Sequence, residues 1–456
     1  MPIPLPARIF GIETEYGISC QIPNKRQLNS DELAKYLFSD IVAQYRSNNV
    51  FLPNGGRLYL DVGSHPEYAT AECDQLEQVI AQELAGDQLV LELARHAEAV
   101  LASEGLPAKV FIFKNNTDSA GNSFGCHENY LIRRRPDGLA ALDTLLPFLV
   151  TRQLLVGAGK LLKTSTGVQY VMSQRAEHLW DSVSSATTRS RPMINTRDEP
   201  HADSDKFRRL HVISADSNRS QVAQLLKVAL MDLLLAVLES GALQTGLRLD
   251  NPMRAIRDVS RDLTGRALVV MADGSTMTAL EIQQWYLEHI TRTVERQDWQ
   301  LSRLHQFVLN TWSQLLHEFA TGEFNEADRV VDWRIKKLLI DTFANRHNLQ
   351  IGDFRLQELE FKYHELNHGV FETVTQSLGL PKVIADHWVT QAKTQPPQST
   401  RAKLRSDFIL WATESKQSFA VDWMHLKVTG ASERGLTLPD PFAAQDSRFK
   451  DFLGAV

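Results

Sequence analysis

Alternating side chains between Arg57 and Val62 predict a β-strand with two chemically different faces. Successive side chains of a strand point to opposite sides, so Arg57, Tyr59 and Asp61 share one face. The other face carries Leu58, Leu60 and Val62. An apolar face of this kind anchors a strand in a hydrophobic core. The pattern therefore predicts a sheet that presents a cation, a phenol and a carboxylate to a cleft; an ion pair between Arg57 and Asp61 is the structural alternative.

A second predicted strand, residues 9–18, carries Glu13 and Glu15 on one face. Two neighbouring carboxylates repel each other, so a bound cation would stabilise the pair. Oxygen ligands favour magnesium, which keeps several waters and binds phosphate groups at the same time. The alternative is a solvated edge strand whose acidic residues discourage aggregation. Flanking Ile and Phe residues indicate a more buried strand and therefore favour the metal.

Composition excludes several classes of protein. The 456 residues can bury a large core, and a net charge of −6 gives no electrostatic support for general nucleic-acid binding. Three cysteines without CxxC spacing indicate neither a disulfide framework nor a zinc ribbon. The N-terminus has no signal-peptide pattern, and Lys227, Asp232 and Glu239 interrupt the most apolar helical segment. We therefore expect a soluble, cytoplasmic monomer without nucleic-acid or membrane partners.

The order of periodic patterns predicts an α+β protein with an antiparallel sheet and packed helices. Residues 109–114 and 126–132 read as strands and resemble a hairpin with a long loop. Helical patterns cover residues 74–105, 142–162, 220–243, 278–297, 302–320 and 326–347. A Pro-rich stretch at 396–400 marks a boundary, which predicts a catalytic domain over 1–390 and a small C-terminal domain over 391–456 with a strand at 419–427.

Arginines concentrate between positions 173 and 211. They are Arg175, Arg189, Arg191, Arg197, Arg208 and Arg209. Guanidinium groups bind phosphate oxygens bidentately and stay charged, so two or three of them would suit a phosphoryl-transfer site. Familiar nucleotide-binding motifs are missing: the Gly-Ala-Gly-Lys segment at 157–160 lacks the residues that complete a P-loop, and we interpret it as a helix–helix contact.

Five longer motifs carry a resemblance to a known family. They are residues 11–17 (GIETEYG), 58–70 (LYLDVGSHPEYAT), 114–119 (KNNTDS), 127–130 (HENY) and 196–203 (TRDEPHAD). Together they resemble the Pup–protein ligase family, and the resemblance runs essentially from end to end. It implies a glutamine synthetase-like antiparallel sheet that forms a concave cradle, backed by helices, with a small C-terminal domain packed against it.

The resemblance also implies a reaction. ATP would phosphorylate the side-chain carboxylate of the C-terminal glutamate of Pup, a small disordered protein modifier. A lysine of a substrate protein would then attack, and the resulting isopeptide bond would mark that protein for a bacterial proteasome. The implied cofactors are ATP and Mg²⁺.

Individual residues match the family's motifs position by position. The resemblance implies magnesium ligation by Glu13, Tyr59 and Glu67, a catalytic base at Asp61, ATP contacts from Arg57, Thr70 and Trp423, and phosphate-transfer positions at His127, Arg175, Arg197 and Arg209. A carboxylate needs phosphorylation before an amine can displace its oxygen, and cations offset the charge repulsion of that transfer. For His127 a packed structural histidine is the alternative.

Other activities on the same fold stay open at this point. The Pup deamidase and depupylase shares the fold, but the interval from Glu13 to Asp61 is too short for its long extra loop, and the Asp61-to-His65 segment follows the ligase pattern. A non-catalytic Pup- or nucleotide-binding module and a small-molecule gamma-glutamyl ligase are the remaining alternatives. We predict ATP-dependent conjugation of Pup to lysine.

Overall fold

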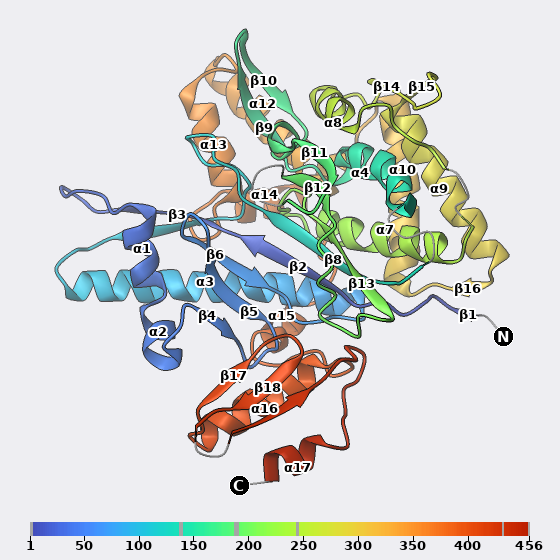
Figure 1. Cartoon of the computed structure of the whole chain (residues 1–456). Coiled ribbons are helices and arrows are strands. Elements are labelled where there is room, and N and C mark those ends of the chain that lie inside the picture. The colour runs from blue at the N-terminus through green and yellow to red at the C-terminus, as the bar shows by residue number, and fades with distance from the viewer. Residues whose placement is uncertain (1–2, 136–139, 187–190, 243–245, 431–432, 455–456) are drawn as a thin grey trace.

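An eight-stranded, mostly antiparallel sheet runs through the middle of the computed structural model, which describes residues 3–135, 140–186, 191–242, 246–430 and 433–454 (Figure 1). In order across the sheet the strands are β11 (Asp181–Ser184), β12 (Pro192–Asn195), β13 (Phe207–Val212), β8 (Cys126–Arg133), β2 (Phe10–Glu15), β6 (His65–Ala69), β5 (Arg57–Asp61) and β4 (Asn49–Phe51). Only the β11–β12 pair is parallel among these strands.

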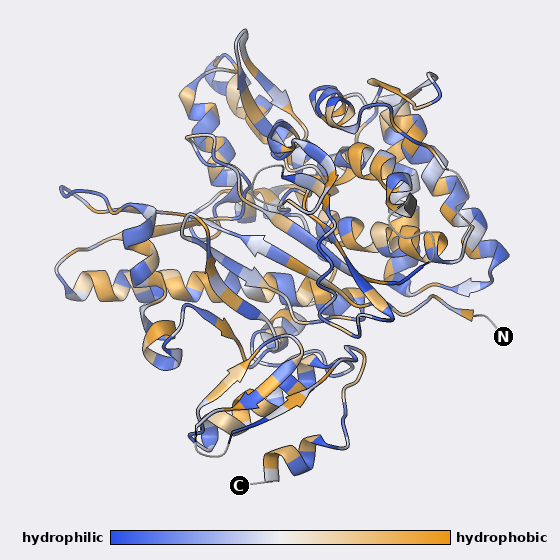
Figure 2. Ribbon diagram, in the orientation of Figure 1, coloured by the Kyte–Doolittle hydropathy of each residue, from blue (hydrophilic) through white to orange (hydrophobic). Residues whose placement is uncertain are grey.

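One face of this sheet is covered by helices α3 (Leu76–Ser103) and α7 (Gln221–Glu239), as Figure 1 shows. Phe10, Ile12 and Tyr130 point toward these helices and are almost fully buried. Helix α7 is the one helix within the described ranges that is long and apolar enough to cross a membrane, and 94% of its apolar window is buried inside the protein. Its hydrophobic character, visible in Figure 2, is therefore that of a core helix.

Further helices complete the helical part of the protein. They are α4 (Leu146–Thr151), α5 (Gln153–Val156), α8 (Pro252–Arg261), α9 (Ala279–Arg296), α10 (Arg303–Thr321), α11 (Ala327–Val330), α12 (Asp332–His347), α13 (Phe354–His364), α14 (Phe371–Leu378) and α15 (Asp386–Ala392). Among them α5, α9, α10 and α11 pack on α7. Local sequence explains several ends: Thr278 and Glu281 form a capping box at the start of α9, and Gly322 ends α10 in the left-handed conformation.

Smaller elements lie at the periphery. Helices α1 (Ser30–Leu37) and α2 (Ser39–Tyr45) precede β4, and the two-stranded sheets are β1 (Ile3–Pro4) with β16 (Trp299–Gln300), β3 (Gly17–Gln21) with β7 (Lys109–Phe113), β9 (Lys160–Thr164) with β10 (Gly167–Val171), and β14 (Leu268–Val270) with β15 (Thr276–Thr278). These elements leave the second face of the central sheet to polar side chains.

The C-terminal residues build a small unit of their own, drawn in red in Figure 1. It consists of α16 (Ala402–Glu414), β17 (Phe419–Val421), β18 (His425–Val428), β19 (Arg434–Thr437) and α17 (Phe449–Gly454). Phe408, Leu426 and Val428 are buried in a hydrophobic cluster that is separate from the main core. The α+β class is confirmed, whereas a domain division at residues 390 and 391 stays a prediction.

Two predicted elements in the first half of the chain are wrong. Residues 109–114 and 126–132 do not form a hairpin, because β7 pairs with β3 while β8 lies between β2 and β13 in the central sheet. The helical pattern at 142–162 ends at Val156, and the Gly-Ala-Gly-Lys segment is a turn into β9 rather than a helix–helix contact. Gly159 takes a φ of +70° there, which a helix interior does not allow.

Two strand ends were also wrongly predicted. The expected strand at 419–427 is a hairpin, because the chain turns at Asp422–Met424 between β17 and β18. Val62 does not enter the core but is 87% exposed. The chain turns directly after β5, with positive φ angles at Gly63 and Ser64, so the period-2 alternation stops at Asp61.

Candidate active site

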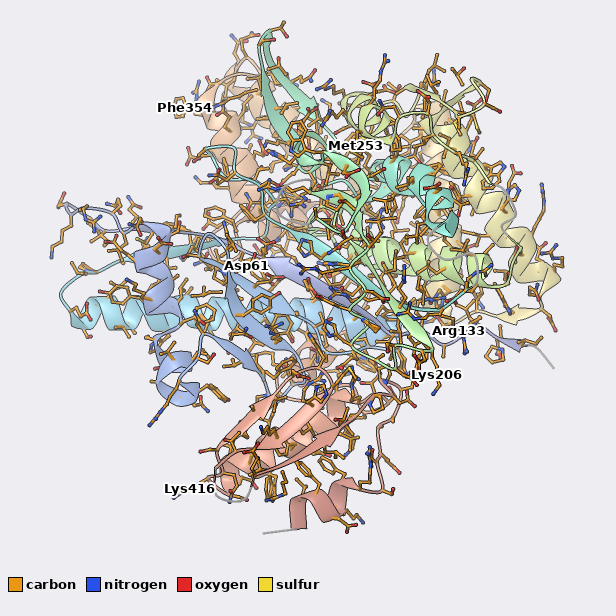
Figure 3. All side chains as sticks on the ribbon, viewed as in Figure 1. Asp61, Arg133, Lys206, Met253, Phe354 and Lys416 are labelled. Carbon is orange, nitrogen blue, oxygen red and sulfur yellow. The ribbon has the colours of Figure 1, made fainter. Side chains whose placement is uncertain are left out.

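The polar face of the central sheet gathers the predicted site residues into rows across the strands. Strand register places Tyr59 opposite Glu67, Glu67 opposite Glu15, and Glu13 opposite His127. Leu58 is buried on the opposite side, which confirms the sorting of β5 into a polar and an apolar face. Asp61 ends β5 on the polar side and lies near the centre of the molecule in Figure 3.

Three carboxylates converge at one end of this face. Glu15, Asp61 and Glu67 each offer an oxygen, and these oxygens all lie within 4.8 Å of one another. Burial of Glu67, together with the charges of Glu13 and Glu15, raises its pKa well above the usual range. Like charges placed directly opposite on adjacent strands are destabilising unless a cation is present. The trio therefore has the donor set and the unbalanced charge that suit a hard divalent cation such as magnesium.

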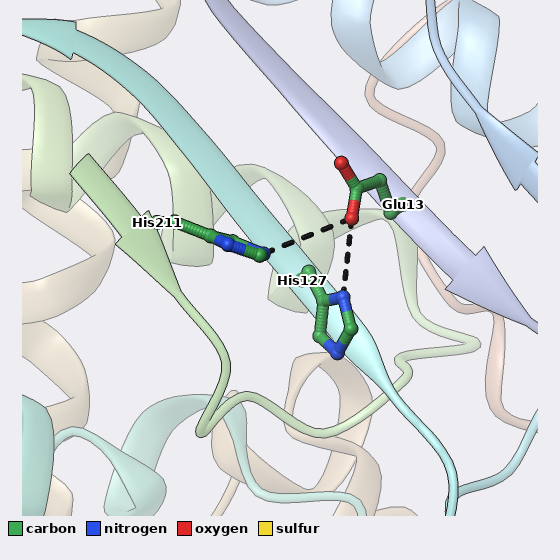
Figure 4. Close-up of side chains that lie close together, drawn as sticks. All are labelled: Glu13, His127 and His211. Atoms are coloured by element: carbon green, nitrogen blue, oxygen red, sulfur yellow. Dashed lines mark hydrogen bonds and ion pairs between the residues drawn. The ribbon is translucent and has the colours of Figure 1, made fainter. Parts of the chain in front are cut away.

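Glu13 belongs to a second trio with two histidines, shown in Figure 4. His127 Nδ1 lies 3.1 Å and His211 Nε2 lies 3.7 Å from Glu13 Oε2. Burial opposes ionisation of Glu13, yet the hydrogen bond from His127 and the positive charge of Arg209 lower its pKa. Burial also lowers the pKa of His211 to about 3, so this histidine is neutral at pH 7. The second trio thus offers a carboxylate and ring nitrogens side by side.

Backbone geometry holds Glu15, a member of the first trio, close to His127 of the second. The Gly125 N–H donates to Glu15 Oε1 at 2.8 Å, and His127 Nε2 lies 3.9 Å from the same oxygen. A Cβ atom on Gly125 would overlap the His127 ring and lie only 2.6 Å from Glu15 Oε1. Glycine is required here because the loop backbone approaches both side chains closely.

A pocket opens beside Glu13, between the central sheet and the C-terminal unit. Its lining includes Glu13, Thr70, His201, Arg209 and Trp423. Thr70 Oγ1 accepts the Ile12 N–H at 3.0 Å, which fixes this side chain at the pocket wall. The pocket joins the acidic strands to the C-terminal unit, which contributes Trp423.

Arg57 lies on the far side of Trp423 in an adjoining cavity. Its Nε donates to Asn49 Oδ1 at 2.8 Å, and its guanidinium stacks 4.5 Å from the centre of the Tyr59 ring. Burial and the charges of Glu13 and Glu67 raise the pKa of Tyr59, so its phenol stays protonated. Arg57 and Tyr59 are therefore held together on the same polar face.

The three arginines that the family resemblance places near the phosphates, Arg209, Arg175 and Arg197, lie in different surroundings. Arg209 reaches the site, with Nη1 3.8 Å from Glu13 Oε1. Arg175 is buried within the electrostatic reach of Glu15, and its guanidinium donates to the carbonyls of Phe124 and Ile213, so it supports the loop before Gly125. Arg197 is largely exposed and pairs loosely with Glu199. Arg189 lies outside the described residues.

The sequence did not identify Glu15 as a metal ligand, and it gave no site role to His211, Asn129 or His201. Glu15 was part of the predicted acidic pair but not of the metal ligands implied by the family resemblance. Asn129 Nδ2 donates to Glu13 Oε1 at 3.2 Å, and His211 lies opposite Asn129 in the sheet register. Alternation within residues 207–212 places Arg209 and His211 on one face, and this pattern could have identified His211 from the sequence.

Comparisons with known proteins agree over nearly the whole chain. A family model described as Pup-ligase protein matches residues 8–427. A Pup–protein ligase of Saccharomonospora viridis is 48% identical over 451 residues, which cover 98% of this chain and 99% of the relative. A Pup–protein ligase of Xylanimonas cellulosilytica is 48% identical over 446 residues, covering 97% of this chain and 98% of the relative.

Two solved structures are similar along the full length. A crystal structure of the complex between the prokaryotic ubiquitin-like protein Pup and its ligase PafA has a TM-score of 0.93 and 42% identity, with coverage of 98% of this chain and 91% of that chain. A structure of the Pup ligase PafA in complex with ADP has a TM-score of 0.85 and 43% identity, with coverage of 95% of this chain and 94% of that chain.

Proposed function

The chain belongs to the Pup-ligase protein family, and we propose that the carboxylates on the polar face of its central sheet carry out the family's reaction. The chain is an ATP-dependent ligase that joins the C-terminal glutamate of Pup to a substrate lysine by an isopeptide bond. The observation that carries this conclusion is 48% identity to a Pup–protein ligase over 98% of the chain. Hydrolysis of that bond is not favoured, because the described segment between Glu15 and Asp61 holds only β3, α1, α2, β4, β5 and short connections, with no long extra loop.

The first chemical step activates the glutamate of Pup. An oxygen of its side-chain carboxylate attacks the γ-phosphorus of ATP, ADP leaves, and an acyl phosphate forms. We assign Glu13, Glu15 and Glu67 to hold magnesium, with the Tyr59 phenol beside them. The support is the close approach of the Glu15 and Glu67 oxygens, together with the pKa of buried Glu67, which burial and the charges of Glu13 and Glu15 raise. A magnesium ion, when bound, would offset the charge repulsion between the phosphates and the incoming carboxylate.

The second step forms the isopeptide bond. The substrate lysine Nζ attacks the acyl carbon, phosphate leaves, and the nitrogen loses a proton. A free lysine has a pKa near ~10.4, so presenting its neutral amine at pH 7 costs roughly 4 kcal/mol unless a base removes the proton during attack. We assign this base to Asp61, because it ends β5 beside an exposed turn where a protein lysine can enter.

The nucleotide is assigned to the pocket between the acidic strands and the C-terminal unit. Thr70 and Trp423 line it, Arg57 lies in the adjoining cavity, and Arg209 approaches Glu13 where phosphate oxygens would lie. Arg175 acts indirectly by supporting the loop before Gly125. We also propose a cytoplasmic location, supported by three free cysteines at positions 20, 73 and 126. A monomeric state stays a prediction.

A reconstituted reaction tests the function directly. Purified protein, ATP, Mg²⁺, glutamate-ended Pup and a lysine-bearing substrate protein should yield a heavier adduct and one ADP per adduct, measured by gel mobility, mass spectrometry and ADP release. Removal of Mg²⁺ with a chelator should stop adduct formation. Deamidation of glutamine-ended Pup without any adduct would instead identify a deamidase, and product from free glutamate and an amine would identify a small-molecule ligase.

Replacing Gly125 by alanine should lower the rate of adduct formation by about 100-fold, because the added Cβ would lie too close to the His127 ring and the Glu15 carboxylate and displace both. Gly352→Ala is the matched control, since its Cβ would meet only Val168 at an ordinary contact distance of 3.7 Å. Initial rates at saturating Pup, with thermal unfolding of each variant, separate the local effect from misfolding. Equal rates for the two variants would contradict the role assigned to Glu15.

A further inference from the structure

The small C-terminal unit reaches the nucleotide pocket through two arginines at the start of α16. Arg401 and Arg405 are almost completely buried, with exposed fractions of 1% and 0%. Both converge on Glu72, which follows β6 and lines the pocket. Burial opposes ionisation of Glu72, but the charges of Arg405 and Arg401 lower its pKa to about 2, so it is a carboxylate at neutral pH.

Arg405 donates hydrogen bonds to acceptors of the C-terminal unit and to acceptors near the central sheet. Nη1 donates to Glu72 Oε1 at 2.9 Å and to the Trp423 carbonyl at 3.1 Å. Nη2 donates to the Gly55 carbonyl at 3.0 Å and also contacts Glu72 Oε2. A planar fork of this kind fixes several acceptors at once, which a single ammonium group cannot do.

The same guanidinium lies against the indole of Trp423. Its Cζ is 5.0 Å from the Trp423 ring and 5.1 Å from the Phe51 ring, and the two rings meet edge to face at 4.9 Å. Trp423 itself occupies the turn between β17 and β18, where no ladder pairing holds it. The orientation of the indole therefore depends on Arg405 and Phe51.

Arg401 makes an equivalent connection to the opposite wall of the pocket. It donates to the His201 carbonyl at 2.8 Å and to the Leu438 carbonyl at 2.7 Å. His201 and Trp423 line both adjoining cavities, and their rings are 6.2 Å apart. Arg401 and Arg405, which both bind Glu72, thus hold His201 and Trp423, two residues of the pocket wall that come from distant parts of the chain.

We propose that Arg405 is a positioning residue for ATP, which orients the Trp423 indole and so sets the affinity for the nucleotide without taking part in phosphoryl transfer. The proposal rests on the nucleotide pocket assigned above. The C-terminal unit thereby contributes to ATP binding through Arg405, although Arg405 itself does not contact ATP. A loss of Arg405 should therefore act on nucleotide affinity and leave the chemical step nearly unchanged.

Arg405→Lys tests this directly. Lysine keeps a positive charge opposite Glu72 but cannot reach Glu72, Trp423 and Gly55 together or stack flat on the indole. We expect the Kd for ADP, from isothermal titration calorimetry, and the KM for ATP to rise about tenfold, while kcat at saturating ATP changes less than about threefold. Arg434→Lys is the matched control, because Arg434 also stacks on two aromatic rings, those of Trp411 and Phe452, inside the same unit, and the ADP affinity of this variant should equal that of the wild type.

A double-mutant cycle on Arg405 and Trp423 distinguishes positioning of the indole from a general loss of structure. If Arg405 acts through Trp423, Trp423→Ala should weaken ADP binding and Arg405→Lys should add little to that loss. The variant Arg405→Met keeps Glu72 paired with Arg401 and leaves the buried charges balanced, so it keeps the proposal testable if Arg405→Lys does not fold. It should show the same rise in Kd.

The outcomes are distinguishable. If the wild-type protein does not bind ADP, the pocket assignment fails and this proposal fails with it. If the wild type binds ADP but folded Arg405 variants bind it equally well, only the positioning role is wrong. Additive losses in the cycle, or a loss confined to kcat, would likewise overturn it.

Discussion

Asp61→Asn should reduce the rate of Pup conjugation by about 10²- to 10⁴-fold while leaving the Kd for ADP within about threefold of the wild-type value. An amide has nearly the shape of a carboxylate but cannot accept the proton that the attacking lysine must lose. Asp61 is one of the three carboxylates of the acidic trio, so its replacement leaves Glu15 and Glu67 in place for the cation. Adduct formation under single-turnover conditions and ADP calorimetry check the two halves of this expectation.

Asp143→Asn is a suitable control for the loss of one carboxylate. Asp143 is about half exposed and pairs with Arg248 far from the polar face, so this variant should conjugate Pup at the wild-type rate. If Asp61→Asn retained more than a tenth of the wild-type rate, another group would have to be the base. If it lost ADP binding as well, Asp61 would act mainly as a ligand of the nucleotide-bound cation.

Glu67→Gln should have opposite effects on activity and on stability. Glu67 is 3% exposed and lies opposite Glu15, with Glu13 nearby, so its charge is costly in the metal-free protein. Neutralising it should raise the free energy of unfolding of the metal-free protein by roughly 1–2 kcal/mol. The same change removes a proposed magnesium ligand and should raise the Mg²⁺ concentration needed for half-maximal activity by about 100-fold. Functional sites commonly show this conflict between stability and activity.

The pH dependence provides a second measurement for this site. Because the folded-state pKa of Glu67 lies above its unfolded value, the metal-free folded protein binds more protons between those two values. Its stability should therefore fall as pH rises from about 4.5, the ordinary glutamate pKa, through the raised pKa of Glu67. The fall should be weaker in Glu67→Gln and weaker in the wild type with Mg²⁺. Thermal unfolding with and without Mg²⁺ measures it, and identical pH profiles for the two proteins would contradict the proposed electrostatics.

Local patterns were reliable where one physical rule dominated. The alternation within the predicted strands 57–62 and 9–18 identified the side chains that share the polar face as far as Asp61 and Glu15, where β5 and β2 end, because side-chain direction in a strand repeats every two residues. Helix α3 was predicted nearly to its ends, since its apolar stripe is long. The apparent hairpin of β7 and β8 was wrong because strand partners are decided by distant segments. Local sequence cannot reveal that β2 inserts beside β8.

The arginines show the same limit at the level of the site. Arg175, Arg197 and Arg209 have equivalent chemistry and similar loop surroundings in the sequence. The fold assigns them different tasks: Arg209 approaches Glu13, Arg175 holds two backbone carbonyls, and Arg197 faces solvent. Their roles follow from which acceptors lie within reach, and those acceptors come from other strands.

The amino-acid sequence by itself determined the residue types of the site, the face of each strand on which they lie, and the family whose motifs they match. These properties follow from short-range stereochemistry and from the order of residues along the chain. Only the tertiary structure decided that Glu15 joins Glu67 and Asp61, that Glu13 lies between two histidines, and that Arg405 holds Trp423 from the C-terminal unit. Charge repulsion and hydrogen bonding depend on separations of a few ångströms, and folding sets those separations between segments that are up to several hundred residues apart.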